Sequence, residues 1–443
     1  MTRSLPPTPS PCSTTQASPR RSFVDLARQA GCLTRQPRKR PPETLIAILL
    51  REAVHGTPSY HDLAAVLDHA NLASISKQAI WKRLTDCFID LMKRLLAMVM
   101  EGQAAVAKPF PGKTFMRVLI QDSTIIRLPA RLFATFGGVA NDGSRVCNAR
   151  IQVVYDLLAG QFVSFAIEPY RKNDQKAAPD LVLLPGDLVL RDRGYLTRDE
   201  IRRHRQAGAD CIYRHQPHTT YLDPADGKPL DLQALLDRHG HLDFQVWLNN
   251  PERTSVRLVA APVDAQTANH RRRKHRQEAK GHAPSAELLR LLGWTIFVTT
   301  VPAARASFAD LLAMYRLRWR IEILFKAWKS NLSFAALHQV SRRQLHALLL
   351  ARLTTIVIIE RNIYRPALAR IEDDYQKQVS ILKLTRYLAR HPTRIHPLVA
   401  ALATTRGPQH PLKAIAKYCC YDRRRRPAFP HLKDETFDTW ALG

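Results

Sequence analysis

Apolar positions between Pro42 and Met100 recur at helical spacing, and they form a continuous stripe at the start of this region. The stripe consists of Leu45, Ile48, Leu49 and Ala53. A spacing of three and four residues places these side chains on one face of a helix. We therefore predict a helical region over residues 41–107, with a break at 56–59.

Within this region the pattern indicates two short helices joined by a turn. Residues 60–67 predict the first helix, 71–75 the turn, and Ser76 is a suitable N-cap for a second helix over 77–87. The second helix would expose Lys77, Gln78, Lys82 and Arg83. Such side chains suit a recognition helix in a major groove. A helical bundle that does not contact DNA has the same pattern, so both interpretations stay open.

After residue 108 the apolar runs shorten to strand length. The predicted elements are strands at 115–120, 150–157, 161–167 and 187–190, with helices at 174–184 and from 197 onward. The two middle strands form a hairpin around Ala159 and Gly160. The order strand, hairpin, helix, strand, helix indicates an α/β fold with a mixed core.

Residues 208–290 are irregular, with short strand-like pieces at 209–214, 244–248 and 255–260, and they predict an inserted β-rich module. A buried strand at 294–300 and a helix from Phe308 to about Asn331 then resume the core, and the rest is mostly helical to about Lys417. The predicted regions are a flexible arm (1–40), a helical domain (41–107), a core in two parts (108–207 and 291–340), the insertion (208–290) and a helical C-terminal region (341–443).

The charge of the chain indicates what kind of partner it binds. Lys and Arg outnumber Asp and Glu by 67 to 38 and give a net charge of +29. Such an excess favours a polyanionic partner. Basic runs lie at 35–40, 202–205, 271–276 and 423–426, which suggests an extended contact with a phosphate backbone. Each run taken alone could instead be a solvated face. Residues 1–40 are rich in Pro, Ser, Thr and Arg and predict a flexible basic arm.

Other partners and compartments are less well supported. The most apolar stretch, 345–359, carries Arg352 and is too short to cross a bilayer, so we expect no membrane association. The first ten residues lack an apolar secretion segment, which predicts a cytoplasmic protein. Seven scattered cysteines without paired spacing support neither a disulfide framework nor a zinc site.

Three acids stand out by their position relative to the predicted elements. Asp122 lies just past a strand, Asp192 at the end of another, and Glu322 on the helix after residue 308. Carboxylates at strand ends are where open α/β sheets assemble active sites. Each acid also has a structural alternative, since Asp122 could cap a turn and Asp192 could pair with Arg191 or Arg193.

The predicted helix adds a stripe of chemically active side chains around Glu322. Tyr315, Arg318, Glu322 and Lys329 are offset by three, seven and fourteen residues, so they fall within an arc of roughly 60°. One face would thus carry a phenol, a guanidinium, a carboxylate and an ammonium, which suits contact with phosphates. The alternative is a ladder of ion pairs, because Arg318 and Glu322 form an i,i+4 pair.

The spacing Tyr-x2-Arg-x3-Glu-x6-Lys resembles the signature of a large branch of DDE transposases from bacterial insertion sequences. Asp192 opens the sequence Asp-Arg-Gly-Tyr, which resembles the second-acid motif of that family, and Asp122-Ser-Thr resembles the first. The resemblance covers about residues 40–430. It implies a ribonuclease-H-like catalytic core that a β-rich insertion interrupts between the second and third acids.

The resemblance also implies a mechanism and partners. Asp122, Asp192 and Glu322 would hold two Mg²⁺ (or Mn²⁺) ions, which prefer oxygen ligands. The other three stripe residues, Tyr315, Arg318 and Lys329, would bind DNA phosphates. The helical domain would bind double-stranded DNA at the terminal inverted repeats, and the nucleoid-associated enzyme would act as a homodimer in a synaptic complex, with dimerisation through the C-terminal region.

Trp294, which lies 28 residues before Glu322, occupies the place of a tryptophan that stacks on a flipped base in this family. It could equally be a core aromatic that opens a buried strand. The implied reaction is cut-and-paste transposition through a hairpin intermediate. Two other functions remain: a metal-dependent nuclease of the same fold without strand transfer, and a DNA-binding regulator without catalysis.

Overall fold

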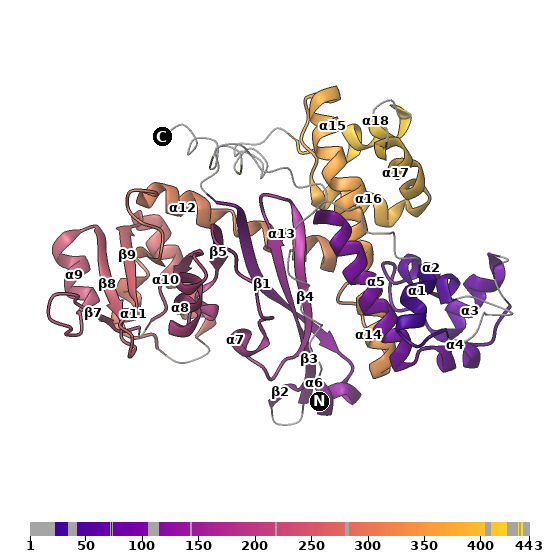
Figure 1. Ribbon diagram of the computed structural model, residues 1–443, viewed down its shortest axis with the longest axis horizontal. Helices are drawn as coiled ribbons and strands as arrows, with labels where there is room; N and C mark the ends of the chain where they lie inside the picture. Colours follow the sequence, from indigo (N-terminus) through magenta and orange to yellow (C-terminus); the bar gives the residue numbers. More distant parts are fainter. Residues whose placement is uncertain are drawn as a thin grey trace.

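The computed structural model describes residues 23–33, 42–70, 72, 74–104, 115–141, 144–217, 219–279, 283–403, 409–422, 433 and 436. A large sheet occupies the middle of the molecule, with β-strands and helices of the insertion on one side and two groups of helices on the other (Figure 1). The fold is therefore mixed α/β, as the sequence predicts.

The sheet is mixed and holds ten strands in the described part of the chain, in the order β2-β3-β1-β5-β6-β10-β9-β8-β7, with β4 paired to β3. The strands are β1 (Arg117–Leu128), β2 (Gly138–Asn141), β3 (Ser144–Asp156), β4 (Gln161–Pro169), β5 (Asp187–Arg191), β6 (Asp210–Arg214), β7 (Tyr221–Leu222), β8 (Leu242–Leu248), β9 (Ser255–Pro262) and β10 (Trp294–Thr299). The predicted hairpin is confirmed, since β3 and β4 pair antiparallel.

Two strand assignments differ from the sequence expectations. β1 continues to Leu128, so Asp122 lies inside this strand and not just past its end. The piece at 209–214, which we assigned to the insertion, is β6 and pairs in parallel with β5. Because β10 pairs with β6 in turn, the strands of the insertion extend the central sheet, although most of their apolar side chains pack in a separate core cluster.

The N-terminal helices are α1 (Phe23–Gln29), α2 (Pro42–Glu52), α3 (Tyr60–His69), α4 (Lys77–Arg83) and α5 (Asp86–Ala104). The predicted stripe on α2 is buried. Ser76 caps α4 as predicted, but α4 ends at Arg83, because a new helix begins at Asp86. The expectation of a flexible arm is wrong for residues 23–33, where Leu26 and Ala27 are buried and α1 packs on α5. The rest of the arm, with the basic run at 35–40, lies outside the described residues.

The C-terminal helices are α14 (Arg342–Ile359), α15 (Arg365–Tyr375), α16 (Ile381–Arg390), α17 (Ile395–Ala403) and α18 (Gln409–Tyr418). α14 packs on α5 and α2, so it connects the two helical regions. Its Arg352 is fully buried and donates hydrogen bonds to the backbone carbonyls of Ala53, Phe334 and Ala336. No helix among the described residues is long and apolar enough to cross a membrane.

The remaining helices are α6 (Phe133–Phe136), α7 (Asp174–Ala177), α8 (Arg198–Gln206), α9 (Leu232–His239), α10 (Ala265–Glu278), α11 (Ala286–Leu291), α12 (Phe308–Arg316) and α13 (Trp319–Asn331). α7 is shorter than predicted because Pro179 disfavours helical backbone at Ala178, which is extended (ψ 129°). The single helix predicted from Phe308 is interrupted at Leu317 and Arg318. There the backbone N–H groups of Arg318 and Ile321 bond to carbonyls three residues earlier.

Candidate active site

Strand pairing brings the first two acids together. β1 and β5 are parallel neighbours, and the last residue pair in their register is Gln121 with Arg191. Asp122 and Asp192 follow this residue pair, so the two acids lie side by side, Asp122 within β1 and Asp192 just past the carboxyl end of β5. This end of β5 is the edge of the sheet that carries the acids. Arg191 does not form the ion pair with Asp192 that the sequence left as an alternative. The buried guanidinium of Arg191 instead pairs with Glu200 of α8, with Nη1 and Oε2 2.6 Å apart.

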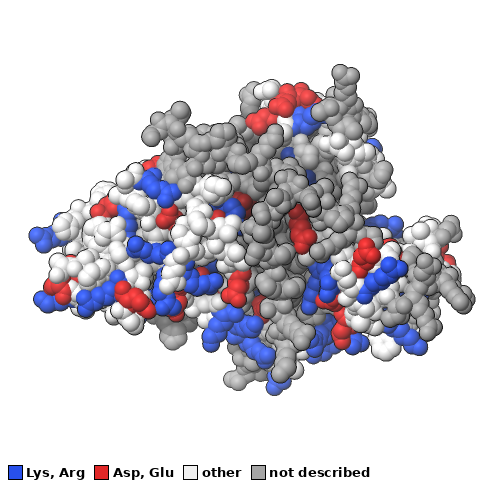
Figure 2. All heavy atoms as spheres, viewed as in Figure 1, with Lys and Arg blue, Asp and Glu red and all other residues white. Residues whose placement is uncertain are grey.

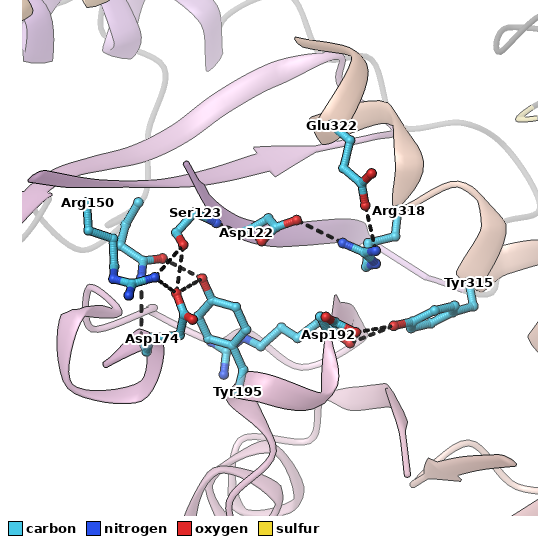
Figure 3. Close-up of polar contacts among 11 residues, drawn as sticks. Asp122, Ser123, Arg150, Asp174, Asp192, Tyr195, Tyr315, Arg318 and Glu322 are labelled. Atoms are coloured by element: carbon cyan, nitrogen blue, oxygen red, sulfur yellow. Dashed lines mark hydrogen bonds and ion pairs between the residues drawn. The ribbon is translucent and has the colours of Figure 1, made fainter. Parts of the chain in front are cut away.

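Glu322 joins the site through Arg318, whose guanidinium lies between two of the acids (Figure 3). Nη1 of Arg318 donates to Oδ2 of Asp122 at 2.8 Å, and Nη2 donates to Oε1 of Glu322 at 2.7 Å. Arg318 is only 8% exposed. The i,i+4 ion pair that we weighed as an alternative is thus present, but it is buried against the first acid and does not belong to a solvated ladder.

Tyr315 and Lys329 also converge on this edge of the sheet. The Tyr315 hydroxyl is buried within hydrogen-bonding distance of the Arg191 carbonyl oxygen (3.3 Å) and of Oδ1 of Asp192 (3.4 Å). Lys329 is exposed, and its Nζ donates to the carbonyl oxygen of Ile125 on β1 at 2.9 Å. The helix break places Tyr315 on α12 and Lys329 on α13, so the residues of the predicted stripe do not lie along one helix. Tyr315 lies against Asp192, Arg318 contacts the other two acids, and Lys329 contacts the backbone of β1.

Burial makes the negative charge at this site unfavourable. It raises the pKa of Asp122 to about 6, and the nearby carboxylates of Glu322 and Asp192 act in the same direction. Arg318 and the backbone N–H of Ser123 oppose this rise. Across the described ranges, no group of three or more His, Cys, Asp or Glu side chains is arranged as a ready metal-binding cluster. The only cationic side chain that the structure pairs with Asp122 in these ranges is Arg318.

A second set of polar contacts lies beside Asp122, at its neighbour Ser123, and the sequence analysis did not identify it. Oδ1 of Asp174, on α7, accepts a hydrogen bond from Oγ of Ser123 at 2.7 Å and pairs with Arg150 of β3. The hydroxyl of Tyr195, in the Asp-Arg-Gly-Tyr motif, donates to Oε1 of Gln152 at 2.8 Å and lies 3.5 Å from Oδ1 of Asp174 (Figure 3). Tyr195 had a signal in its motif, whereas Asp174 had none, because its role depends on strands that are distant in sequence.

Trp294 is the first residue of β10 and is half-buried against the core cluster of the insertion. β10 runs antiparallel to β6, and its Phe297 pairs with Arg214, the last residue of β6. Trp294 therefore lies beyond the end of β6, toward the edge that carries the acids. Its carbonyl accepts a hydrogen bond from Arg271 of α10. Base stacking by this ring stays a prediction.

The residues predicted for end recognition do not join the acid cluster. Lys77, Gln78, Lys82 and Arg83 are all exposed on α4. Figure 1 shows α4 among the N-terminal helices, on the opposite side of the central sheet from the insertion. Their DNA contact also stays a prediction.

Comparisons with known proteins give the family. Residues 113–358, more than half of the chain, match the family model described as "Transposase DDE domain". The chain is 24% identical over 371 residues to the transposase for insertion sequence element IS231D of Bacillus thuringiensis subsp. finitimus, covering 78% of this chain and 77% of that protein. It is 27% identical over 355 residues to the transposase for insertion sequence element IS421 of Escherichia coli, covering 77% of this chain and 90% of that protein.

Among solved structures, a piggyBac transposase synaptic complex with hairpin DNA aligns over 91% of this chain and 82% of that chain, with a TM-score of 0.36 and 9% identity. That likeness is too distant to argue from. The match over residues 113–358, which contains all three acids, is decisive: the chain belongs to the DDE transposases of bacterial insertion sequences.

Proposed function

We propose that this transposase cleaves the ends of its own insertion sequence and joins the freed 3′-OH to target DNA. The observation that carries the proposal is the convergence of Asp122, Asp192 and Glu322 on one sheet edge, with Arg318 between two of them. Asp122 is partly buried, and the nearby carboxylates of Asp192 and Glu322 make its negative charge more costly unless a cation offsets it. They are therefore suited to a function that brings a cation to this edge.

The donor set fits divalent metal ions. Mg²⁺ and Mn²⁺ prefer hard oxygen ligands, and carboxylates provide them. Burial raises the pKa of Asp122 even beside Arg318, so added positive charge would stabilise the ionised site. Asp122, Asp192 and Glu322 would hold the ions, for which we propose two. When bound, such ions activate an attacking oxygen and stabilise a leaving oxygen at phosphorus.

The strand order supports a ribonuclease-H-like core. β4, β3 and β1 form an antiparallel unit, and β5 and β6 continue it in parallel with β1. In this arrangement Asp122 lies on the central strand and Asp192 at the end of its parallel neighbour. Glu322 then approaches from α13, which follows the interruption of the core by the insertion.

The side chains around the acids have roles of their own. Arg318 is paired with Asp122 and Glu322 here, and we propose that it exchanges a carboxylate for a DNA phosphate when an end binds. Tyr315 orients Asp192 through its hydroxyl, and Lys329 is exposed beside β1 where a phosphate could reach it. Trp294 would stack on a base that leaves the duplex.

The remaining proposals concern partners. Residues 41–107 would bind the terminal inverted repeats, a homodimer would hold two ends, and the second strand would be freed through a hairpin. A nuclease of the same fold would need the same acids. Joining of a donor end to a target duplex separates the two functions, because only a transposase carries out that step.

The test uses the full chain with duplexes that carry the DNA bordering its reading frame. Asp122→Asn, Asp192→Asn and Glu322→Gln should each abolish Mg²⁺-dependent cleavage and joining, because each removes a carboxylate while keeping shape, and end binding should persist. Asp199→Asn, at an exposed acid of α8, is the matched control and should cleave normally. Cleavage near the wild-type rate in an acid variant would remove that residue from the site.

A further inference from the structure

The exposed face of α4 carries a tryptophan among long polar side chains. Trp81 is 58% exposed, and Lys77, Gln78 and Lys82 are exposed with it. At about 100° per residue these four side chains fall within an arc of about 140°. Ile80, which points the other way, is fully buried and holds the helix against the domain core. The face is therefore a formed surface on a fixed helix.

A pocket opens beside Trp81, between α3, α4 and the start of α14. It has a volume of about 200 Å³ and is lined by Tyr60, Trp81, Lys82, Leu84, Ser341 and Arg343. The lining combines two aromatic rings and a leucine with two cationic groups and a hydroxyl. Apolar and aromatic surface beside cations matches a ligand that is flat and apolar on one part and anionic on another, as the bases and phosphates of DNA are.

The cations of this surface are available to such a ligand. Within the described residues, Lys77 and Lys82 form no hydrogen bond or ion pair. Arg343 pairs with Asp86, but both side chains are more than half exposed, and exposed pairs of this kind are weak. A phosphate could replace the Asp86 carboxylate at little cost. Single exposed apolar residues are common on protein surfaces, so the cations and the pocket are what single out Trp81.

We propose that Trp81 contacts the bases of duplex DNA that lies along α4 and the start of α14, and that Lys77, Lys82 and Arg343 hold the flanking phosphates. The proposal rests on the proposed binding of transposon ends by residues 41–107, and it identifies a residue there that determines sequence preference. Trp81 provides apolar contact with base edges or a base step, and the cations provide affinity for any sequence.

The two kinds of contact respond differently to salt and to sequence. A phosphate contact releases counterions, so a variant without it binds all duplexes more weakly and has a slope of log K against log salt that is lower by about one. A base contact releases none. Trp81→Ala should therefore weaken binding to the cognate end about tenfold or more, leave a scrambled duplex unaffected and keep the salt slope. Lys77→Ala and Lys82→Ala should weaken both duplexes and lower the slope.

The experiment is a fluorescence anisotropy titration of the full chain with a duplex from the border of its reading frame and a scrambled duplex of equal length and composition. Trp81→Phe should keep much of the preference for the cognate duplex. Tyr418→Ala, which removes an aromatic side chain of similar exposure on α18, is the matched control and should bind as the wild type does. Melting temperatures should be equal throughout, because Trp81 is largely exposed.

Three results would overturn the inference. Trp81→Ala could bind the cognate end as tightly as the wild type, it could weaken both duplexes equally, or it could alter sedimentation without altering DNA affinity, which would make the face a protein interface. A wild-type chain that has no preference for its own ends is a separate result. That result would contradict the proposed binding of the transposon ends by residues 41–107, and the inference about Trp81 would fail with it.

Discussion

At the residue scale, Arg318 has a different environment from the one its sequence position predicts. An arginine four residues before a glutamate on an exposed helix contributes a few tenths of a kcal/mol. Here the guanidinium is buried and also contacts Asp122 from a strand almost two hundred positions earlier. Arg318 therefore serves as the counterion of two carboxylates as well as a candidate phosphate ligand. Replacing Arg318 should therefore affect both stability and cleavage. Lys329 is exposed, so replacing it should affect cleavage without affecting stability.

We predict that Lys329→Ala reduces single-turnover cleavage of a pre-bound end by about 10²-fold while its melting temperature barely changes, because a group that positions a phosphate acts mainly in the transition state. Lys326→Ala, at an exposed lysine on the same helix, is the control and should cleave normally. Wild-type cleavage by Lys329→Ala would exclude the phosphate contact.

Arg318→Ala should lower the melting temperature in the absence of divalent ions, because Asp122 and Glu322 lose their shared cation. Added Mg²⁺ should then raise its melting temperature by more than it raises that of the wild type. Thermal unfolding with and without Mg²⁺ measures both effects without reference to activity. If Mg²⁺ raised the melting temperatures of the two proteins equally, Asp122 and Glu322 would not be the carboxylates that bind the ion.

His204 of α8 makes the stability of the fold depend on pH. Its Nδ1 contacts the Glu200 carbonyl oxygen, and its buried Nε2 has no partner among the residues that the structure describes. Burial lowers the pKa of His204 to about 4 from the usual 6.5. The unfolded chain therefore takes up a proton below about pH 6.5 while the folded chain does not, and stability falls as pH falls from about 6.5 to 4. Urea unfolding at pH 7 and pH 5 should show a smaller loss in His204→Asn than in the wild type; equal losses would contradict this role.

At the scale of elements, α13 is held by a buried charged cluster on the side away from the acids. Oε1 of Glu360, in the π-helical turn that follows α14, accepts hydrogen bonds from the Tyr155 hydroxyl at 2.8 Å and from Nη2 of Arg320 at 3.3 Å. Arg320 lies two residues before Glu322, so the cluster connects α13 to β3 and to the C-terminal helices. We infer that it fixes the orientation of α13.

Glu360→Ala should destabilise the fold by about 3–5 kcal/mol, because it leaves the buried charge of Arg320 without this carboxylate. The double variant Arg320→Met/Glu360→Leu should recover most of that loss, since it removes both charges. Lys383→Ala, which breaks the exposed pair with Asp422, is the control and should cost under about 1 kcal/mol. Urea unfolding measures all three. A double variant less stable than Glu360→Ala would show that the cluster does more than balance charge.

At the scale of the whole molecule, the face drawn in Figure 2 carries basic side chains both over the insertion and over the N-terminal helices. The four basic runs are not equivalent. The run at 202–205 on α8 is largely neutralised by ion pairs with Asp199, Glu200 and Glu252. On α10, Arg271 donates to the backbone carbonyl of Trp294 on β10, and Arg272 donates to that of Leu289 on α11. Arg273, Lys274 and Arg276 remain exposed on the same helix, and Lys274 has only a long, exposed ion pair with Glu278 (3.9 Å). The run at 423–426 lies outside the described residues.

The affinity for DNA should therefore fall steeply as the salt concentration rises, because the release of counterions from DNA then favours binding less. Replacing Arg273, Lys274 and Arg276 together by alanine should lower the slope of log K against log salt by about one for each phosphate that the variant no longer binds. Arg202→Ala/Arg203→Ala should leave the slope nearly unchanged, because Arg202 has two acidic partners and the partner of Arg203, Glu200, is fixed by the buried Arg191. Affinities measured from low to physiological salt test both statements, and equal slopes in the two variants would contradict the assignment.

The sequence by itself determined those features that depend on neighbours along the chain. The stripe on α2, the Ser76 cap, the β3–β4 hairpin and the strand before Asp192 all follow from local periodicity and turn residues. Local spacing also indicated the resemblance to the DDE transposases, the family that the match over residues 113–358 shows. These features could be predicted because each depends on interactions among residues that are close together in the sequence.

The tertiary structure decided what depends on contacts between distant segments. Register between β1 and β5 makes Asp122 and Asp192 adjacent, and pairing with β5 assigns β6 to the central sheet and not to the insertion. The hydrogen bond from Ser123, the neighbour of Asp122, to Asp174 also requires two separate elements to meet. The spacing of residues along the chain does not predict these contacts. The backbone hydrogen bonds between strands and the buried ion pairs form only when the sheet and α13 have packed together.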